Sequence, residues 1–316
     1  MSTATLTSAR KSTQAIERPH PLLSVLTWEL RRLLASRLFW IQALCFFVLV
    51  LFVIWVGREP DQFGFNTFNG FVAGTSAWGL LHILPTGLLV LLALLLPFVA
   101  ADSVTRDLQR RTHELLMTTA LPTWAYVWGR YLIGLLVSLG LAVLLLFAIL
   151  LMGLLLHLTV PNYPAPEIGN VLILWGGMVV PATILVSSVS FALGTLFPRL
   201  SLLIKIGMLV VWFVGAIMLP AGLGDQTAPP AWYSAWDPTS AATAKGMLFQ
   251  NTIDFQNLTA NPTGAAQFQT AILTIENRLS DLGAWLAPHL ILACLSLLLV
   301  VLAAFTFQRF RNTFGA

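Results

Sequence analysis

Six stretches of the chain are long and apolar enough to cross a lipid bilayer, and they constrain the fold more than any other feature. A helix rises about 1.5 Å per residue, so about 20 apolar residues cross the roughly 30 Å hydrocarbon core. Only 9% of the 316 residues are charged and 57% are apolar, whereas about 25% are charged in soluble domains. The sequence therefore predicts an all-α polytopic membrane protein and excludes a soluble enzyme, a disulfide-rich secreted module and a disordered chain. The six predicted spans cover 38–56, 80–101, 131–158, 171–197, 202–223 and 285–307.

The distribution of positive charge orients the predicted spans. With the N-terminus in the cytosol, fourteen of the 17 lysine and arginine residues fall in cytosolic segments, and Arg58, Lys245 and Arg278 fall outside. Cytosolic loops carry an excess of these residues, so both termini are predicted to be cytosolic. Residues 1–21 and 308–316 are then cytosolic tails, the first of them disordered. The net charge of +4 is explained by topology rather than by nucleic-acid binding.

Tryptophans and cysteines near the spans have simple predicted roles. Tryptophan is enriched at membrane–water interfaces. The tryptophans expected to act as such anchors are Trp40, Trp55, Trp78, Trp128 and Trp285. Cys45 and Cys294 lie within apolar stretches, so we expect two buried thiols that pack as small apolar groups and form no disulfide.

Residues 22–37 precede the first span and have the pattern of an interfacial helix. Leucines recur there at helical spacing, while Glu29, Arg31 and Arg32 lie mostly elsewhere around the helix. Such a helix lies in the inner headgroup layer, with its basic residues toward anionic lipid. A simple positively charged anchor for the first span is the alternative interpretation.

The predicted cytosolic loop 102–130 is long and charged. Asp102 and Ser103 are residues that cap helix N-termini, and the following VTRDLQRRTHELL predicts a short polar helix before Pro122. A charged helix that two spans hold just under the bilayer is suited to docking a cytosolic partner. A solvated connection between helices is the alternative.

The last outer loop, 224–284, is long and polar and contains one amphipathic segment. We expect an outer helix there that lies over the spans or at the membrane surface. The apolar stripe of this helix consists of Phe268, Ile272, Ile275, Leu279 and Leu282.

The sequence lacks the residue patterns of several membrane functions. The predicted spans contain no Asp, Glu or Arg between their ends, which argues against an ion-coupled carrier because such carriers need ionisable groups in the membrane. No cluster with metal-ligand spacing and no phosphate-binding loop is present. Ser76 with His289 superficially matches the dyad of an intramembrane protease, but Ser76 falls in an outer loop. The chain is therefore predicted not to be an enzyme and to bind no metal.

Several residues of loop 102–130 stand in the order of a known signature. Asp107 is followed by Arg111-Thr112, Glu114, Leu115-Leu116, Pro122 and Gly129-Arg130. This order resembles the signature of type-2 ATP-binding-cassette exporter permeases, in which glycine usually stands at the place of Arg111 and lysine at the place of Arg130. The segments 28–32 and 187–199 are similar to the elbow helix and to the end of the fourth span in that family.

The resemblance implies a permease subunit of an exporter, with a six-span domain over 38–307. Two permease chains, identical or related, would form the transmembrane path, and each would dock a cytosolic ATPase through a coupling helix between spans two and three. ATP and magnesium would then be used by the partner, with no cofactor bound by this chain, in a cytoplasmic membrane of bacterial type. The implied coupling residues are Asp107, Arg110, Arg111, Thr112, Glu114 and Leu115, and the implied interfacial elbow residues are Trp28, Glu29, Arg31 and Arg32.

Two questions stay open after the resemblance. The apolar path favours a lipid-like, amphipathic or peptide substrate. A scaffold or assembly subunit that retains the permease fold without transporting anything is the alternative function.

Overall fold

Six helical spans form the body of the protein and confirm the prediction of a multi-pass helical membrane protein. The computed structural model describes residues 21–65, 68–100, 122–224, 227–260, 264–279 and 282–313. Short helix α1 (Pro21–Leu34) precedes the first span. The spans are formed by α2 (Arg37–Val56), α3 (Ala77–Ile83) with α4 (Leu89–Ala100), α7 (Thr123–Thr159), α8 (Ile168–Leu174) with α9 (Val180–Leu196), α10 (Ser201–Phe213) with α11 (Leu219–Gly222), and α15 (Leu282–Thr313).

Spans 2, 4 and 5 each contain a π-helical segment near a proline. These segments are η1 (Leu84–Leu88), η2 (Trp175–Val179) and η4 (Val214–Met218). Proline has no N–H and its ring collides with the carbonyl four residues earlier, so the hydrogen-bond ladder is rearranged near it. Pro85 lies inside η1, and Pro181 and Pro220 each follow a π segment by two residues. A single 3-10 turn, η3 (Pro198–Leu200), joins span 4 to span 5.

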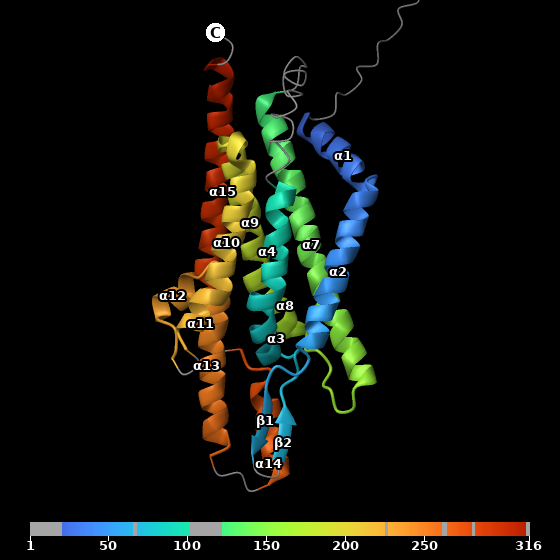
Figure 1. The fold of residues 1–316 in the computed structure, drawn as a ribbon, viewed down its shortest axis with the longest axis vertical. Helices are drawn as coiled ribbons and strands as arrows, with labels where there is room; N and C mark the ends of the chain where they lie inside the picture. The colour runs from blue at the N-terminus through green and yellow to red at the C-terminus, as the bar shows by residue number, and fades with distance from the viewer. Residues whose placement is uncertain are drawn as a thin grey trace, which may run out of the picture.

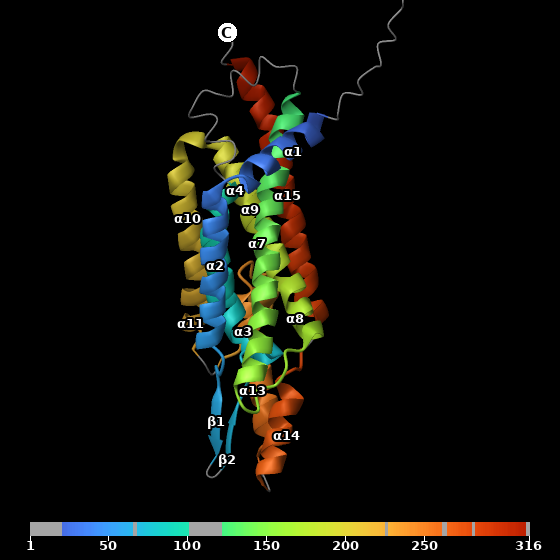
Figure 2. The same ribbon diagram turned by 90° about the vertical axis from the view of Figure 1, so that its right-hand side faces the viewer.

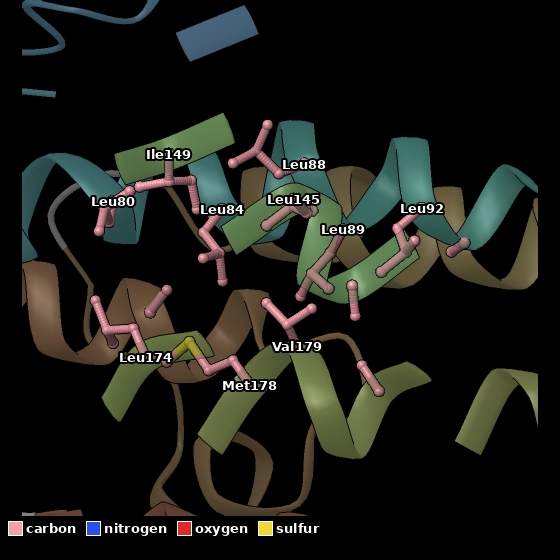
Figure 3. Packing of buried hydrophobic residues seen from close by; sticks show 14 of the residues in the cluster. Leu80, Leu84, Leu88, Leu89, Leu92, Leu145, Ile149, Leu174, Met178 and Val179 are labelled. Carbon is pink, nitrogen blue, oxygen red and sulfur yellow. The ribbon is translucent and has the colours of Figure 1, made fainter. Parts of the chain in front are cut away.

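Spans 2 and 4 form the centre of the bundle. Half of the apolar window of span 2 and 61% of that of span 4 are buried, whereas spans 1 and 5 are each 17% buried. Figure 3 shows the contact between them, where leucines of span 2 meet Leu145 and Ile149 of span 3 and Met178 and Val179 of span 4. Spans 1 and 5 therefore present most of their surface to lipid or to another protein.

The segments that precede, connect and follow the spans lie at the two ends of the bundle. α1, the start of α7, the turn at η3 and the end of α15 lie at one end, which we call the α1 end (Figures 1 and 2). The described basic residues at this end are Arg31, Arg32, Arg37, Arg130, Arg199, Lys205, Arg309 and Arg311. The three basic residues predicted to be outside belong to segments at the opposite end. The two predicted groups of charge are thus separated along the bundle.

Three predicted boundaries differ from the structure. The segment 22–37 is divided, because α1 ends at Leu34 and α2 starts at Arg37, with the Trp40 indole donating to the Leu34 carbonyl at 2.8 Å. α7 starts eight residues before the predicted span, and its 37 residues give it a length of about 55 Å. It therefore extends beyond the hydrocarbon core. α15 continues to Thr313, through most of the predicted tail.

The loop after span 1 contains a short β-hairpin, which the sequence analysis did not predict, within an otherwise helical fold. β1 (Gln62–Phe65) pairs antiparallel with β2 (Phe68–Phe71), and Phe65 lies opposite Phe68. Phenylalanine is enriched in strands, and four phenylalanines occur in these eight residues. An analysis of helical periodicity does not detect strands of only four residues.

The described residues between spans 5 and 6 form three helices rather than one: α12 (Ala231–Trp236), α13 (Ala241–Leu258) and α14 (Ala265–Ile275). The predicted apolar stripe is present, since Phe268, Ile272 and Ile275 are buried. Their contacts are with β2 and α13 rather than with the membrane surface, and Gly70 of β2 packs directly against Ile272. The hairpin, α13 and α14 therefore share a small apolar core beyond the spans (Figure 1).

Two of the expected interface tryptophans and both cysteines are placed differently from the prediction. Trp78 and Trp285 are 1% and 3% exposed. The Trp78 ring packs edge-on against Phe255 of α13, and the Trp285 ring lies close to the Cα of Gly177. Cys45 and Cys294 are exposed rather than buried, because they lie on the outward faces of two peripheral spans.

We expect Ile272→Ala to destabilise the outer core by about 2–5 kcal/mol, because it removes buried methyl groups and leaves a cavity. The neighbouring Leu273 is 54% exposed, so Leu273→Ala is the matched control and should have little effect. Hydrogen exchange of the α14 backbone amides measures the local free energy of opening. Equal protection in the two variants would contradict the packing described here.

Glu276, just after α14, makes the stability of the region formed by the hairpin, α13 and α14 depend on pH. Burial raises the pKa of this carboxyl, although the Ala73 backbone N–H donates to it and acts in the opposite direction. Its contribution to stability is therefore fully present below its ordinary pKa of 4.5 and is lost as pH rises through the higher native value. Glu276→Gln should raise the melting temperature at neutral pH and leave it nearly unchanged near pH 4. A difference independent of pH would contradict this assignment.

Candidate functional site

The α1 end of the bundle contains a close junction between α1 and α7. A methyl group at Gly129 of α7 would lie 2.7 Å from Cγ1 of Val25 on α1, so only glycine permits this approach of the two helices. α1 is amphipathic, with Leu23 and Trp28 among its exposed residues and Glu29 as its one buried residue. The face that carries Glu29 is therefore the face that meets α7.

A buried ion pair joins the two helices. Oε1 of Glu29 lies 2.5 Å from Nη1 of Arg130, and the two residues are only 5% and 6% exposed. Removing two charges from water is costly, so such a pair persists only when its geometry is good and other groups assist. The Arg130 guanidinium lies 5.5 Å from the Tyr126 ring centre and 6.0 Å from that of Trp28. These aromatic faces attract the cation and shield it from solvent.

The basic residues of α1 face outward from this junction. Arg32 lies 3.7 Å from Glu29 and 5.7 Å from the Trp28 ring centre, and its side chain is 48% exposed. Arg31 is exposed as well. One carboxylate therefore interacts with a buried arginine on α7 and an exposed arginine on its own helix.

The junction gives a physical role to two residues of the signature, Gly129 and Arg130, whose contacts with α1 the sequence did not predict. Gly129 allows the close approach, and Arg130 supplies the charge that Glu29 requires. Arginine suits a buried pair because its guanidinium is always charged and is less strongly hydrated than an ammonium group. The signal available in the sequence was one acidic residue on a basic helix, with a single arginine at the start of a later span.

The predicted coupling residues lie outside the described part of the chain. Asp107, Arg110, Arg111, Thr112, Glu114 and Leu115 all fall within 101–121. The described chain ends before this segment at Ala100 of α4 and resumes at Pro122, which precedes α7. Arg130 is about two helical turns from Thr123, so the ion pair lies close to the point where this segment joins span 3.

A second buried polar cluster joins α13 to span 6. The Asp237 carboxylate accepts from the Thr239 and Ala242 N–H groups at 2.9 and 2.7 Å, and thereby caps the start of α13. Ser240 has a φ of 62° and its hydroxyl lies 3.1 Å from Nε2 of His289. Ser240 is fully buried, so its contact with His289 helps to position the start of α13 against span 6.

The structure gives no support to the Ser76–His289 dyad. The Ser76 hydroxyl donates to the Ala73 carbonyl at 2.7 Å and accepts from the Gly79 N–H at 3.2 Å, as a helix cap does. His289 interacts with Ser240 and with the Trp285 carbonyl. Among the described residues, no group of three or more His, Cys, Asp or Glu side chains is placed to hold a metal ion.

Glu29→Gln should destabilise the junction by about 3–5 kcal/mol, because it removes the carboxylate that lies 2.5 Å from the buried Arg130 guanidinium. Replacing both residues, as in Glu29→Gln with Arg130→Met, should recover part of the loss, since the buried guanidinium is then removed together with this carboxylate. Asp254→Asn is the control, because Asp254 pairs at 2.8 Å with the exposed Arg278, and such pairs contribute at most about 1 kcal/mol. Thermal unfolding of these three variants and of Arg130→Met alone measures these differences, and additive single effects would contradict the pairing.

Comparison with known proteins identifies no family for this chain. No protein-family model matches it, and no curated protein matches it.

Proposed function

We propose that this chain is the permease subunit of an ATP-driven exporter and that separate cytosolic ATPase subunits supply the energy. The observation that carries the proposal is the buried Glu29–Arg130 pair. It ties the helix before span 1 to span 3, next to the segment in which sequence reasoning places contact with the ATPase. Movement of that segment would then be passed to spans 1 and 3 together.

The separation of charge supports the orientation that the proposal requires. Eight described basic residues lie at the α1 end and three lie at the hairpin end, and the excess of positive charge marks the cytosolic side. The proposal therefore has α1, loop 101–121 and both termini in the cytosol of a bacterial-type cell. The hairpin, α13 and α14 would lie outside the cytoplasmic membrane.

The peripheral position of spans 1 and 5 supports pairing with a second permease, identical or related. Most of the large exposed side chains of these spans are apolar, which suits lipid or another membrane protein. The remainder of the site, including the coupling residues Asp107 to Leu115, is assigned through the resemblance alone.

A pull-down tests the proposal. The tagged chain is expressed from its native operon, purified in mild detergent, and analysed by mass spectrometry and an ATPase assay. We expect a stoichiometric soluble ATPase that hydrolyses Mg-ATP. Recovery of the chain without an ATPase would favour the scaffold alternative.

We expect Glu114→Lys to reduce ATPase recovery or to uncouple hydrolysis from transport by at least about tenfold, because it reverses a charge at the proposed contact. Glu17→Lys makes the same exchange in the N-terminal tail and should leave both quantities unchanged. If assembly and transport both survive Glu114→Lys, the docking assignment is wrong.

A further inference from the structure

A large cavity lies at the hairpin end, between spans 2 and 5 and helix α13. Its volume is about 1010 Å³, comparable with the upper range of small-molecule sites. Span 2 contributes residues of α3 and η1, span 5 contributes residues of η4 and α11, and the whole length of α13 forms the third wall. The cavity is thus built from elements that are far apart in the sequence and belongs to neither of the polar clusters described above.

Two of the three π-helical segments form its walls. Pro85 and Thr86 of η1 and Ala216 and Ile217 of η4 line it. A π turn inserts an extra residue into a helix and is frequently found at functional sites. The rearranged turns of spans 2 and 5 therefore coincide with the cavity rather than being scattered along the spans.

The charged groups of the cavity are arranged unequally. Asp61 Oδ2 lies 3.4 Å from Nε2 of His82, whose imidazole pairs with the carboxylate as an ion only when it is protonated. The Lys245 ammonium donates to the Pro220 carbonyl at 2.6 Å, and no described carboxylate lies within ion-pair distance of it. Lysine has three N–H donors, so this cation can bind an additional acceptor.

Most of the remaining lining is apolar. Trp78 and Leu81 of α3, Ile217 of η4, and Leu248, Phe249 and Ile253 of α13 face the cavity. Thr86, Thr252 and Gln256 add polar groups beside Lys245, Asp61 and His82. Apolar walls with polar groups among them suit small amphipathic ligands. Lys245 favours an anionic ligand over a neutral one, because no described carboxylate lies within ion-pair distance of its ammonium group, whereas Asp61 lies beside His82.

We propose that this cavity binds an amphipathic anion, whose charged head group accepts hydrogen bonds from Lys245 and whose apolar part lies against the walls of α3, η4 and α13. The proposal does not depend on the exporter function, because binding to the chain alone requires no ATPase. The anion can come from the outer leaflet, as an anionic phospholipid, or from the pool of free fatty acids.

The test uses the full chain in phosphatidylcholine nanodiscs and the fluorescent fatty acid cis-parinaric acid as the probe, with empty nanodiscs subtracted. Lys245→Gln should weaken binding by about tenfold or more, because a charge-assisted hydrogen bond is lost. Lys245→Arg keeps the charge and should largely restore affinity. Arg278→Gln removes a cation at the same end but outside the cavity and should have no effect.

Competition on the wild-type chain keeps the proposal testable even if a Lys245 variant fails to fold. Laurate should displace the probe, and dodecanol, which has the same alkyl chain without the charge, should displace it at least about tenfold less effectively. Equal displacement by the two, or unchanged affinity in folded Lys245→Gln, would overturn the proposal. Nanodiscs that contain phosphatidylglycerol distinguish the sources, since an outer-leaflet lipid would compete with the probe and lower its apparent affinity.

Discussion

A hydrocarbon environment offers no hydrogen-bond partner to the backbone and no counter-ion to a charge, and this constraint shapes the protein throughout. Helices satisfy their own backbone groups, so the spans are helical. Where a proline removes a donor, as at Pro85 and Pro220, the ladder widens into a π segment rather than breaking. Charged side chains occur where another part of the chain can meet them.

The charged residues near the ends of the spans show how the protein compensates for the lack of counter-ions in hydrocarbon. Arg130 is held by Glu29 between two aromatic rings, and Lys205 lies 5.0 Å from the Phe98 ring centre. Each cation is matched by a group from a different helix. The same interactions therefore stabilise the cations and help to fix how neighbouring helices are placed, since a buried pair persists only when its geometry is good.

The sequence was sufficient for features that depend on composition along a single segment. The six spans and the buried stripe of Phe268, Ile272 and Ile275 follow from hydrophobic patterning. Features that depend on two distant segments were missed. Trp78 and Trp285 lie near span ends, as interface anchors do, and only contact with Phe255 and Gly177 shows that they are buried. The exposed cysteines were missed because an apolar span does not reveal which side faces inward.

Span 2 connects the proposed ATPase-docking segment with the cavity at the hairpin end. α4 ends at Ala100, where the proposed ATPase-docking segment begins, and the same span passes through η1 into the wall of the cavity. Between these points it is packed against spans 3 and 4 (Figure 3), and close-packed interiors shift between discrete arrangements rather than deforming continuously. A displacement imposed at Ala100 would therefore reach the cavity through η1, where the helix is already irregular. On the exporter proposal, the cavity and the docking segment would then be opposite ends of one moving element.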